Sequence, residues 1–313
     1  MSTPNSILDR FILFLKGVAM GAADAVPGVS GGTIAFITGI YDELLNSIRS
    51  ANLKAVQLIL KGRFAEFSAH INLPFLLVLV SGIALSLLSL SKLVLYLMEH
   101  QPILLWSFFF GLVLASIWSI GKQIERFGLG ILSLFVAGVV AAFWITTVSP
   151  SQTPETWWFI MMSGAIAICA MILPGISGSF ILLLLGKYRF ILESLNEFRL
   201  GIIFLFSVGM VAGITSFSHL LHWLLHRYRN YTIAVLAGFM LGSLNKVWPW
   251  KVPIQIYLDS KGKVHTLTER NLWPTRYEDL TGFPAEWGMA LLVALMGAAL
   301  VLLLERLGSC KSA

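Results

Sequence analysis

Long apolar runs set the strongest limit on what this chain can fold into. Several stretches without charge, such as 102–121 and 129–148, approach the ~20 residues that an α-helix needs to cross a bilayer. Of the 313 residues, 57% are apolar and 12% are charged, against roughly 45–50% and about 25% in soluble domains. A soluble chain of this size cannot hide so much apolar surface, because its folded surface remains too large. The sequence therefore predicts an all-α integral membrane protein.

An internal duplication divides the chain into two halves. The segment 27–48 matches 174–195 without gaps at nine of 22 positions, which include the opening Pro, Gly, Ser and Gly. Further along, 82–100 aligns with 209–227, and the offset between the halves falls from 147 to 127 residues. Self-similarity of this kind is the signature of a repeated structural unit.

Each half is predicted to contain a helical hairpin and three transmembrane helices. Proline cannot continue a helix and glycine permits a tight reversal, so the Pro-Gly pairs at 27–28 and 174–175 break the two hairpins. The arms are short, and we expect both hairpins to be re-entrant, buried in protein or beside a wet cavity. The first repeat covers 1–150. It is predicted to begin with a hairpin over 10–48, whose arms are 10–25 and 31–48, and to continue with an amphipathic segment over 52–70. The helical region 73–148 follows, with helices at 73–98, 102–121 and 129–148. The second repeat covers 151–313. It is predicted to begin with a hairpin over 158–195, whose arms are 158–172 and 178–195. The region 201–305 follows, with helices at 201–225, 231–247 and 286–305, and a periplasmic loop over 248–285 within it forms a small β-hairpin.

The number of membrane crossings determines the relative orientation of the halves. An odd number of crossings in each half inverts the second half relative to the first, as in many secondary transporters. Basic residues gather in the loops that the positive-inside rule assigns to the cytoplasm, among them Arg49, Lys122, Arg227 and Arg229. Both termini are therefore predicted to be cytoplasmic. The formal charge of +6 then indicates contact with anionic membrane lipids and not with nucleic acid.

The two Pro-Gly-x-Ser-Gly sequences each open a new helical arm. A helix start presents unpaired backbone N–H groups and a positive dipole end, which suits an anion such as phosphate. Alternatively, the serines only cap helices and the glycines only pack them; the duplication in opposite orientations favours the anion site. The predicted phosphate-binding residues are Gly28, Ser30, Gly31, Gly32, Thr33, Gly175, Ser177, Gly178 and Ser179, with Pro27 and Pro174 as hairpin breakers.

Asp24 is the acidic residue that precedes the first hairpin tip within a predicted arm. Charged side chains inside a membrane are costly and are functional candidates by default. Two interpretations are open: Asp24 takes up a proton that couples transport to the proton gradient, or it pairs with a cation such as Lys92. Lys92 aligns with His219 across the repeat, and His222 lies three residues further on. These histidines either titrate near neutral pH or form interhelical hydrogen bonds.

Lys187 and Arg189 lie at the end of the second hairpin's outer arm. Their charge suits attraction of an anionic headgroup, although a snorkelling interfacial cluster explains them equally well. Cys169 and Cys310 indicate neither a disulfide framework nor a metal site. The sequence therefore predicts no catalytic residue, no metal and no cofactor, and it is compatible with a homo-oligomer.

Specific motifs surround both hairpins: they read GAADxVPGVSGGT at 21–33, GIY at 39–41 and LPGISG at 173–178. These motifs resemble the PopT family of polyprenyl-phosphate transporters, formerly a domain of unknown function, over nearly the whole chain. The resemblance implies a flippase that returns undecaprenyl phosphate from the outer to the inner leaflet of the bacterial cytoplasmic membrane. The carrier is then reused for peptidoglycan and other envelope polymers. We expect this transport to be coupled to an ion gradient.

An enzyme is the strongest alternative. Undecaprenyl-diphosphate phosphatases of the BacA type also resemble inverted repeats with re-entrant hairpins, and they carry Pro-Gly-x-Ser followed by arginine. Here Gly31 and Gly178 stand in the place of that arginine, and the first hairpin lacks the paired glutamates. Phosphoryl transfer depends on cationic stabilisation of developing charge, so the sequence favours a transporter. A transporter of small inorganic anions would use the same kind of site.

Overall fold

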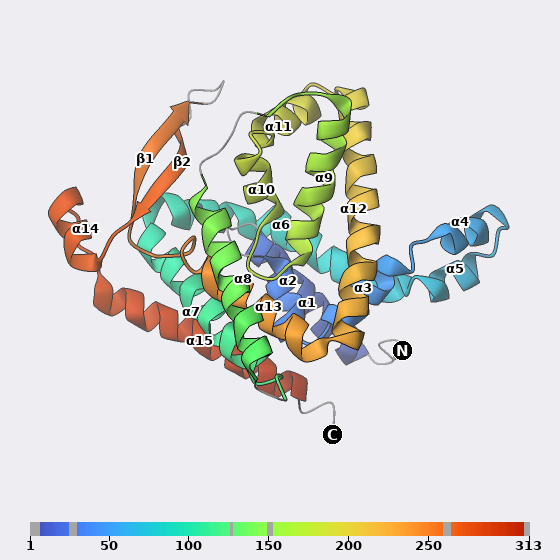
Figure 1. The fold of residues 1–313 in the computed structure, drawn as a ribbon, viewed down its shortest axis with the longest axis horizontal. Coiled ribbons are helices and arrows are strands. Elements are labelled where there is room, and N and C mark those ends of the chain that lie inside the picture. Colours follow the sequence, from blue (N-terminus) through green and yellow to red (C-terminus); the bar gives the residue numbers. More distant parts are fainter. Residues whose placement is uncertain (1–6, 25–29, 126–127, 149–152, 259–263, 310–313) are drawn as a thin grey trace.

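A computed structural model describes residues 7–24, 30–125, 128–148, 153–258 and 264–309 (Figure 1). The described chain is mostly helical and contains one two-stranded sheet. The start of α1 and the end of α15 lie at the lower side of the view, and the two strands reach its upper left. The predicted all-α class is therefore confirmed.

The helices follow the predicted order, with the two strands near the C-terminal end. The first part of the chain forms α1 (Ile7–Asp24), α2 (Gly31–Ile37), α3 (Tyr41–Arg49), α4 (Leu53–Leu60), α5 (Phe64–His70), α6 (Leu73–His100), α7 (Pro102–Gly121) and α8 (Leu129–Thr147). The second part forms α9 (Trp157–Ile172), α10 (Gly178–Leu184), α11 (Tyr188–Asn196), α12 (Leu200–Arg227), α13 (Arg229–Ser243), β1 (Lys251–Leu258), β2 (Val264–Asn271), α14 (Pro274–Thr281) and α15 (Trp287–Ser309).

Four helices of the described chain are long and apolar enough to cross a membrane. They are α6, α7, α8 and α12, while the apolar helices α9 and α15 offer shorter windows. The short helices α4 and α5 project sideways from the other helices in Figure 1. Leu53, Leu60 and Phe64 are exposed on this projection, as expected of amphipathic helices that lie in a membrane interface. The chain is a helical membrane protein.

Close helix pairs form the framework of the molecule. Helix α1 packs along α6 and α9 along α12, while α7 packs along α15 and α13 along α8. Glycines allow these backbones to approach: a Cβ at Gly82 would overlap the carbonyl oxygen of Phe14, and a Cβ at Gly209 would overlap that of Met161. Gly82 and Gly209 are matched positions of the sequence repeat, and so are Phe14 and Met161. The same contact therefore occurs once in each half.

The buried core surrounds α2. Every residue of this short helix is buried, and it contacts α1, α7, α9 and α15. Ala35 of α2, Ile120 of α7 and Met240 of α13 each have an exposed fraction of 0%. The helix that begins at the first Pro-Gly-x-Ser-Gly sequence thus lies in the interior and not on the surface.

The second arm of each hairpin is interrupted, whereas continuous arms were predicted over 31–48 and 178–195. Helix α2 ends at Ile37, where Gly39 has a φ of +72° and the Ile40 N–H donates to the Ala35 carbonyl. Helix α10 ends in the same way at Leu184, where Gly186 has a φ of +63° and the Lys187 N–H donates to the Leu182 carbonyl. Glycine in the left-handed region closes a helix by the Schellman pattern of hydrogen bonds. The prediction of continuous arms was wrong because it passed over this glycine stop signal.

The small β-hairpin is fixed to the helical body by buried charges. Strands β1 and β2 are antiparallel, with Lys251 opposite Asn271. The ammonium of Lys251 lies 3.5 Å from the ring centroid of Trp106 in α7 and 3.5 Å from the carboxylate of Glu269. Lys246, just beyond α13, lies 2.9 Å from the same carboxylate. Cation–π attraction and these ion pairs therefore hold the hairpin against the ends of α7 and α13.

Candidate functional site

The predicted site residues lie where the two helical hairpins, α1–α2 and α9–α10, present their tips. Pro27 and Gly28 lie outside the described residues. In the second hairpin Pro174 and Gly175 form a buried turn between α9 and α10, and Gly175 has a φ of +90°. A Cβ there would lie 2.8 Å from Ser243 Oγ, so both the turn and the neighbouring helix require glycine.

The start of α2 is occupied by the chain's own side chains. The Gly31 N–H donates to the Asp24 carboxylate at 2.7 Å, and the Gly32 N–H donates to Ser30 Oγ at 3.0 Å. Asp24 therefore holds the position that an anion takes at a helix start, where unpaired N–H groups and the positive dipole end meet. Ser30 is the N-cap of α2 and is fully buried.

The two tips are joined to each other by three hydrogen bonds. Ser30 Oγ donates to the Met171 carbonyl at 2.8 Å, and the Gly175 N–H donates to Thr33 Oγ1 at 3.1 Å. Tyr41, at the start of α3, donates its hydroxyl proton to the Ile172 carbonyl at 3.0 Å. Ser30 of the first hairpin and Tyr41 of α3 thus satisfy two carbonyls at the C-terminal end of α9, which have no partner within that helix.

The start of α10 lacks such a cap. Ser177 is its N-cap residue, but the side chain makes no capping hydrogen bond. The Ser177 and Ser179 hydroxyls instead pair with each other at 2.7 Å. Gly178 is buried between them, and a Cβ there would lie 2.6 Å from the Ala167 carbonyl. Two hydroxyl groups and the first amides of α10 are therefore gathered at one helix start.

The two histidines predicted on the long helix α12 make no contact with Asp24 among the described residues. The side chain of Lys92 lies outside the described part of the structure. His219 is exposed, and its Nδ1 lies 2.7 Å from the Thr215 carbonyl of its own helix. The ring of His222 lies 3.9 Å from that of His226, and its buried Nδ1 has no hydrogen-bond partner among the described residues. The structure thus does not bring His219 or His222 to Asp24.

Lys187 and Arg189 lie at the far end of α10, and each has a partner. Lys187 is 1% exposed, and its ammonium donates to the Thr153 carbonyl at 2.7 Å. The same ammonium lies 5.7 Å from the ring centroid of Phe159 and 5.3 Å from that of Phe190. Arg189 is exposed and forms an ion pair with Glu193 at 2.6 Å. Attraction of a headgroup by these two residues stays a prediction.

Tyr41 contributes a side chain to the tip contacts and is not among the predicted site residues. Its hydroxyl links the two hairpins, and its side chain is 3% exposed. The match between Tyr41 and Tyr188 in the repeat is the sequence signal that points to it. The described residues contain no cluster of His, Cys, Asp or Glu arranged for a metal ion. The tips thus combine the Asp24 carboxylate at the start of α2 with hydroxyl and amide groups at the start of α10, and the latter suit an oxyanion.

Residues 20–265 match the family model described as VCA0040-like, undecaprenyl phosphate translocase-like. The chain belongs to this family. It is 50% identical over 293 residues to the polyprenyl-phosphate transporter of Vibrio cholerae serotype O1, with 94% of this chain and 95% of the relative covered. It is 32% identical over 260 residues to the polyprenyl-phosphate transporter of Staphylococcus aureus, with 77% and 87% covered. No solved structure matches the chain.

Proposed function

We propose that this protein carries undecaprenyl phosphate, or a related polyprenyl phosphate, from the outer to the inner leaflet of the bacterial cytoplasmic membrane. The observation that carries the proposal is the meeting of two broken hairpins, whose buried hydroxyls and amides are surrounded by apolar helices. Thr33 accepts from the Gly175 N–H at 3.1 Å, across the two hairpins. The names of the two curated relatives, both polyprenyl-phosphate transporters, identify the substrate class.

The phosphate group is proposed to bind at the hairpin tips. The start of α10 offers the Ser177 and Ser179 hydroxyls and amides that no side chain caps. At the start of α2 the carboxylate of Asp24 occupies the equivalent position. In our proposal this carboxylate must leave or be neutralised before phosphate contacts Gly31, which is how a proton on Asp24 would couple transport to the proton gradient.

An apolar cavity beside the first hairpin supports a lipid substrate. Its volume is about 200 Å³, and it lies between α1, α2, α7 and α15. The lining is almost entirely aliphatic and aromatic, with Thr38 as the polar side chain. Burial of isoprene units against such a lining is favourable at about 0.8 kcal/mol per CH₂, whereas an inorganic anion gains nothing there. The cavity thus favours a polyprenyl phosphate over a small anion.

The two halves are proposed to form an inverted repeat with re-entrant hairpins and cytoplasmic termini. The matched glycine contacts of Gly82 and Gly209 support the repeat. Labelling of single cysteines tests the orientation, with Cys169 and Cys310 first replaced by serine. Asp42 and Arg189 are exposed and occupy matched positions. Cysteines there should react with an impermeant maleimide from opposite sides of the membrane; reaction from one side would refute the inverted arrangement.

Transport itself is tested in liposomes that contain the purified protein. A fluorescent polyprenyl phosphate should change leaflet, as measured by quenching from one side, while inorganic phosphate release from undecaprenyl diphosphate stays at background. The hairpin segments 20–40 and 167–186 contain no Arg and no Glu, so cationic stabilisation of phosphoryl transfer is missing there. Sustained release of phosphate by the pure protein would show that it is an enzyme.

A further inference from the structure

A second cavity, which is polar, lies at the far end of the first hairpin, on the side of the molecule where α1 begins and α15 ends in Figure 1. Its volume is about 370 Å³, and it is bounded by the turn after α2, the start of α3 and the ends of α7, α12 and α13. Volumes of roughly 300–1,000 Å³ are usual for ligand sites. The lining residues are Phe36, Gly39, Tyr41, Asp42, Gln123, Leu225, His226, Arg229 and Ile233.

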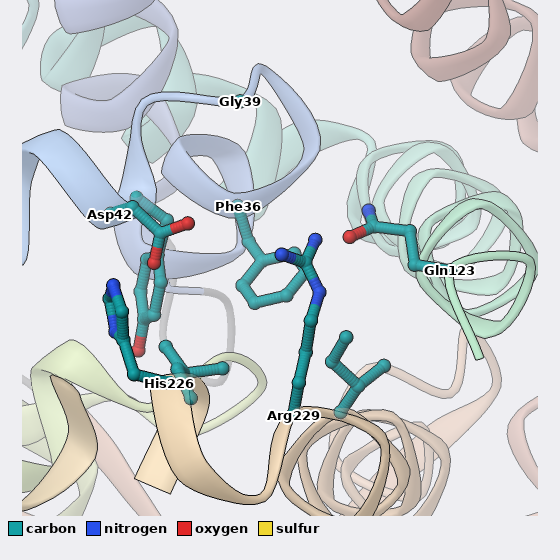
Figure 2. Close-up of a pocket in the computed structure, with 9 residues that line it drawn as sticks. Phe36, Gly39, Asp42, Gln123, His226 and Arg229 are labelled. Carbon is teal, nitrogen blue, oxygen red and sulfur yellow. The ribbon is translucent and has the colours of Figure 1, made fainter. Parts of the chain in front are cut away.

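Arg229 supplies the cation of this cavity. Figure 2 shows its side chain extending from the start of α13 into the open space, with its guanidinium beside Phe36 and between Asp42 and Gln123. Within the part of the chain that the structure describes, the guanidinium makes no ion pair within 4.0 Å and no hydrogen bond. Its donors therefore remain available in the fork geometry that fits a phosphate group in a bidentate manner.

Two further polar side chains surround the same space. His226 lies at the wall of the cavity, and its Nδ1 donates to the His222 carbonyl at 2.9 Å. In the neutral ring Nε2 is then an acceptor, which suits a phosphate oxygen that carries a proton. Figure 2 shows the carboxamide oxygen of Gln123, an acceptor, on the side of the guanidinium, with the amide nitrogen, a donor, further away. Helix α13 begins at Arg229, and its N-cap residue, Tyr228, makes no side-chain cap. The positive end of this helix thus adds to the charge of Arg229.

Asp42 is the acidic residue of the lining, and it limits what the cavity can bind. Its carboxylate faces the interior but lies beyond ion-pair distance of Arg229. An anion that binds to the guanidinium must therefore be compact and must approach from the side away from Asp42. A phosphate monoester meets this requirement, because its charge is concentrated on one small group that accepts several hydrogen bonds.

We infer that this cavity binds the phosphate monoester group of the transported lipid on the side where α1 begins and α15 ends, with Arg229 as the principal ligand. The inference rests on the proposed function, and it adds a headgroup site next to the hairpin tips, with Tyr41 in contact with both places. From the sequence alone, Arg229 is one of the basic residues that mark a cytoplasmic loop. The site would receive the headgroup as it leaves the tips, because α2 joins the two places directly.

Binding to the purified protein in detergent tests this site. Farnesyl phosphate and inorganic phosphate are titrated by calorimetry, and farnesol serves as the ligand that lacks the phosphate. Arg229→Gln should weaken binding of farnesyl phosphate roughly 10- to 100-fold, while farnesol binding stays unchanged. Arg227→Gln is the matched control, because Arg227 is exposed, lies two residues away and does not line the cavity. Arg229→Lys, which keeps the charge, should restore part of the affinity.

The two phosphate ligands distinguish the source of the bound group. If Arg229→Gln loses affinity for both farnesyl phosphate and inorganic phosphate, the phosphate group is sufficient for binding in the cavity. If it loses affinity for farnesyl phosphate only, the chain and the headgroup bind together. Either result supports the site. Equal affinities in Arg229→Gln and Arg227→Gln would overturn it. The liposome assay keeps this outcome apart from failure of the proposed function. Wild-type protein that moves no lipid refutes transport, whereas active protein with an unaffected Arg229→Gln variant refutes only this cavity.

Discussion

Replacement of Asp24 separates its roles as a helix cap, an ion-pair partner and a proton carrier. The Asp24 carboxylate accepts from the Gly31 N–H at 2.7 Å, so alanine leaves a buried donor without a partner. An unsatisfied buried donor costs about 1–3 kcal/mol. Asparagine keeps an acceptor oxygen and loses only the attraction between charge and helix dipole, about 0.3–1 kcal/mol. Asp24→Ala should therefore unfold at a clearly lower temperature than Asp24→Asn.

An ion pair with Lys92 predicts a different order of stability. Either substitution of Asp24 would then leave a buried cation without its partner, at a cost of roughly 3–5 kcal/mol. Both variants should lose expression and thermal stability together, and Lys92→Met in the same chain should rescue them. Thermal unfolding in detergent, followed by tryptophan fluorescence, distinguishes the two cases. A stable Asp24→Asn variant beside a weakened Asp24→Ala variant would show that the contact with Gly31 dominates.

The same asparagine variant tests the proton role. It fixes the neutral state of the side chain, so polyprenyl phosphate should still bind, and bind more tightly once the competing charge at Gly31 is gone. Transport should proceed toward equal leaflet populations, while accumulation driven by a proton gradient disappears. The measurement is leaflet-resolved fluorescence in liposomes with and without an imposed pH difference. An Asp24→Asn protein whose transport depends on the gradient as strongly as the wild type would refute the reasoning.

Two further substitutions follow from packing and charge. Gly209→Ala should destabilise the protein by about 1–3 kcal/mol in thermal unfolding, because the new Cβ overlaps a backbone carbonyl of α9. The control is Gly201→Ala on the same helix, whose Cβ meets no atom within 4 Å. This control should be neutral or stabilising by up to about 1 kcal/mol. Burial raises the pKa of Glu269, but the ammonium groups of Lys251 and Lys246 outweigh it, and the net shift is downward. A lowered pKa stabilises the fold above the unfolded value of about 4.3, and this contribution is lost as the pH falls further. Melting curves from neutral to acidic pH should show a loss in the wild type that Glu269→Gln lacks.

The positions of the long helices could be predicted from the sequence because local signals mark their ends. The helix predicted over 102–121 begins and ends at those residues in the structure, since a proline at the first position and a following lysine bound its apolar run. The hairpin arms were predicted less well. Local hydrogen bonds around Gly39 and Gly186 end α2 and α10. A prediction based only on the length of the apolar runs does not detect these helix ends.

The contacts within the site could not be predicted, because they join residues that are distant in sequence. Ser30 and Met171 are 141 residues apart, and Gly175 and Thr33 are 142 apart. The sequence repeat predicts that both hairpin tips exist, but it does not predict which hydroxyl donates to which carbonyl. Asp24 was recognised as unusual from its charge, yet its role at the start of α2 follows only from the fold. Arg229 carries no motif, and only the cavity around it indicates a ligand.

The glycine contacts between α1 and α6, and between α9 and α12, have a mechanical consequence. Backbones that touch over several turns cannot slide past each other without collision, so each first arm must move together with its long partner helix. Helix α6 has 28 residues and is therefore about 42 Å long. A small tilt at the tip becomes a large displacement at its opposite end. Each long helix thus amplifies a motion of its tip, and a spin label at the outer end of the helix would report the opening of that tip.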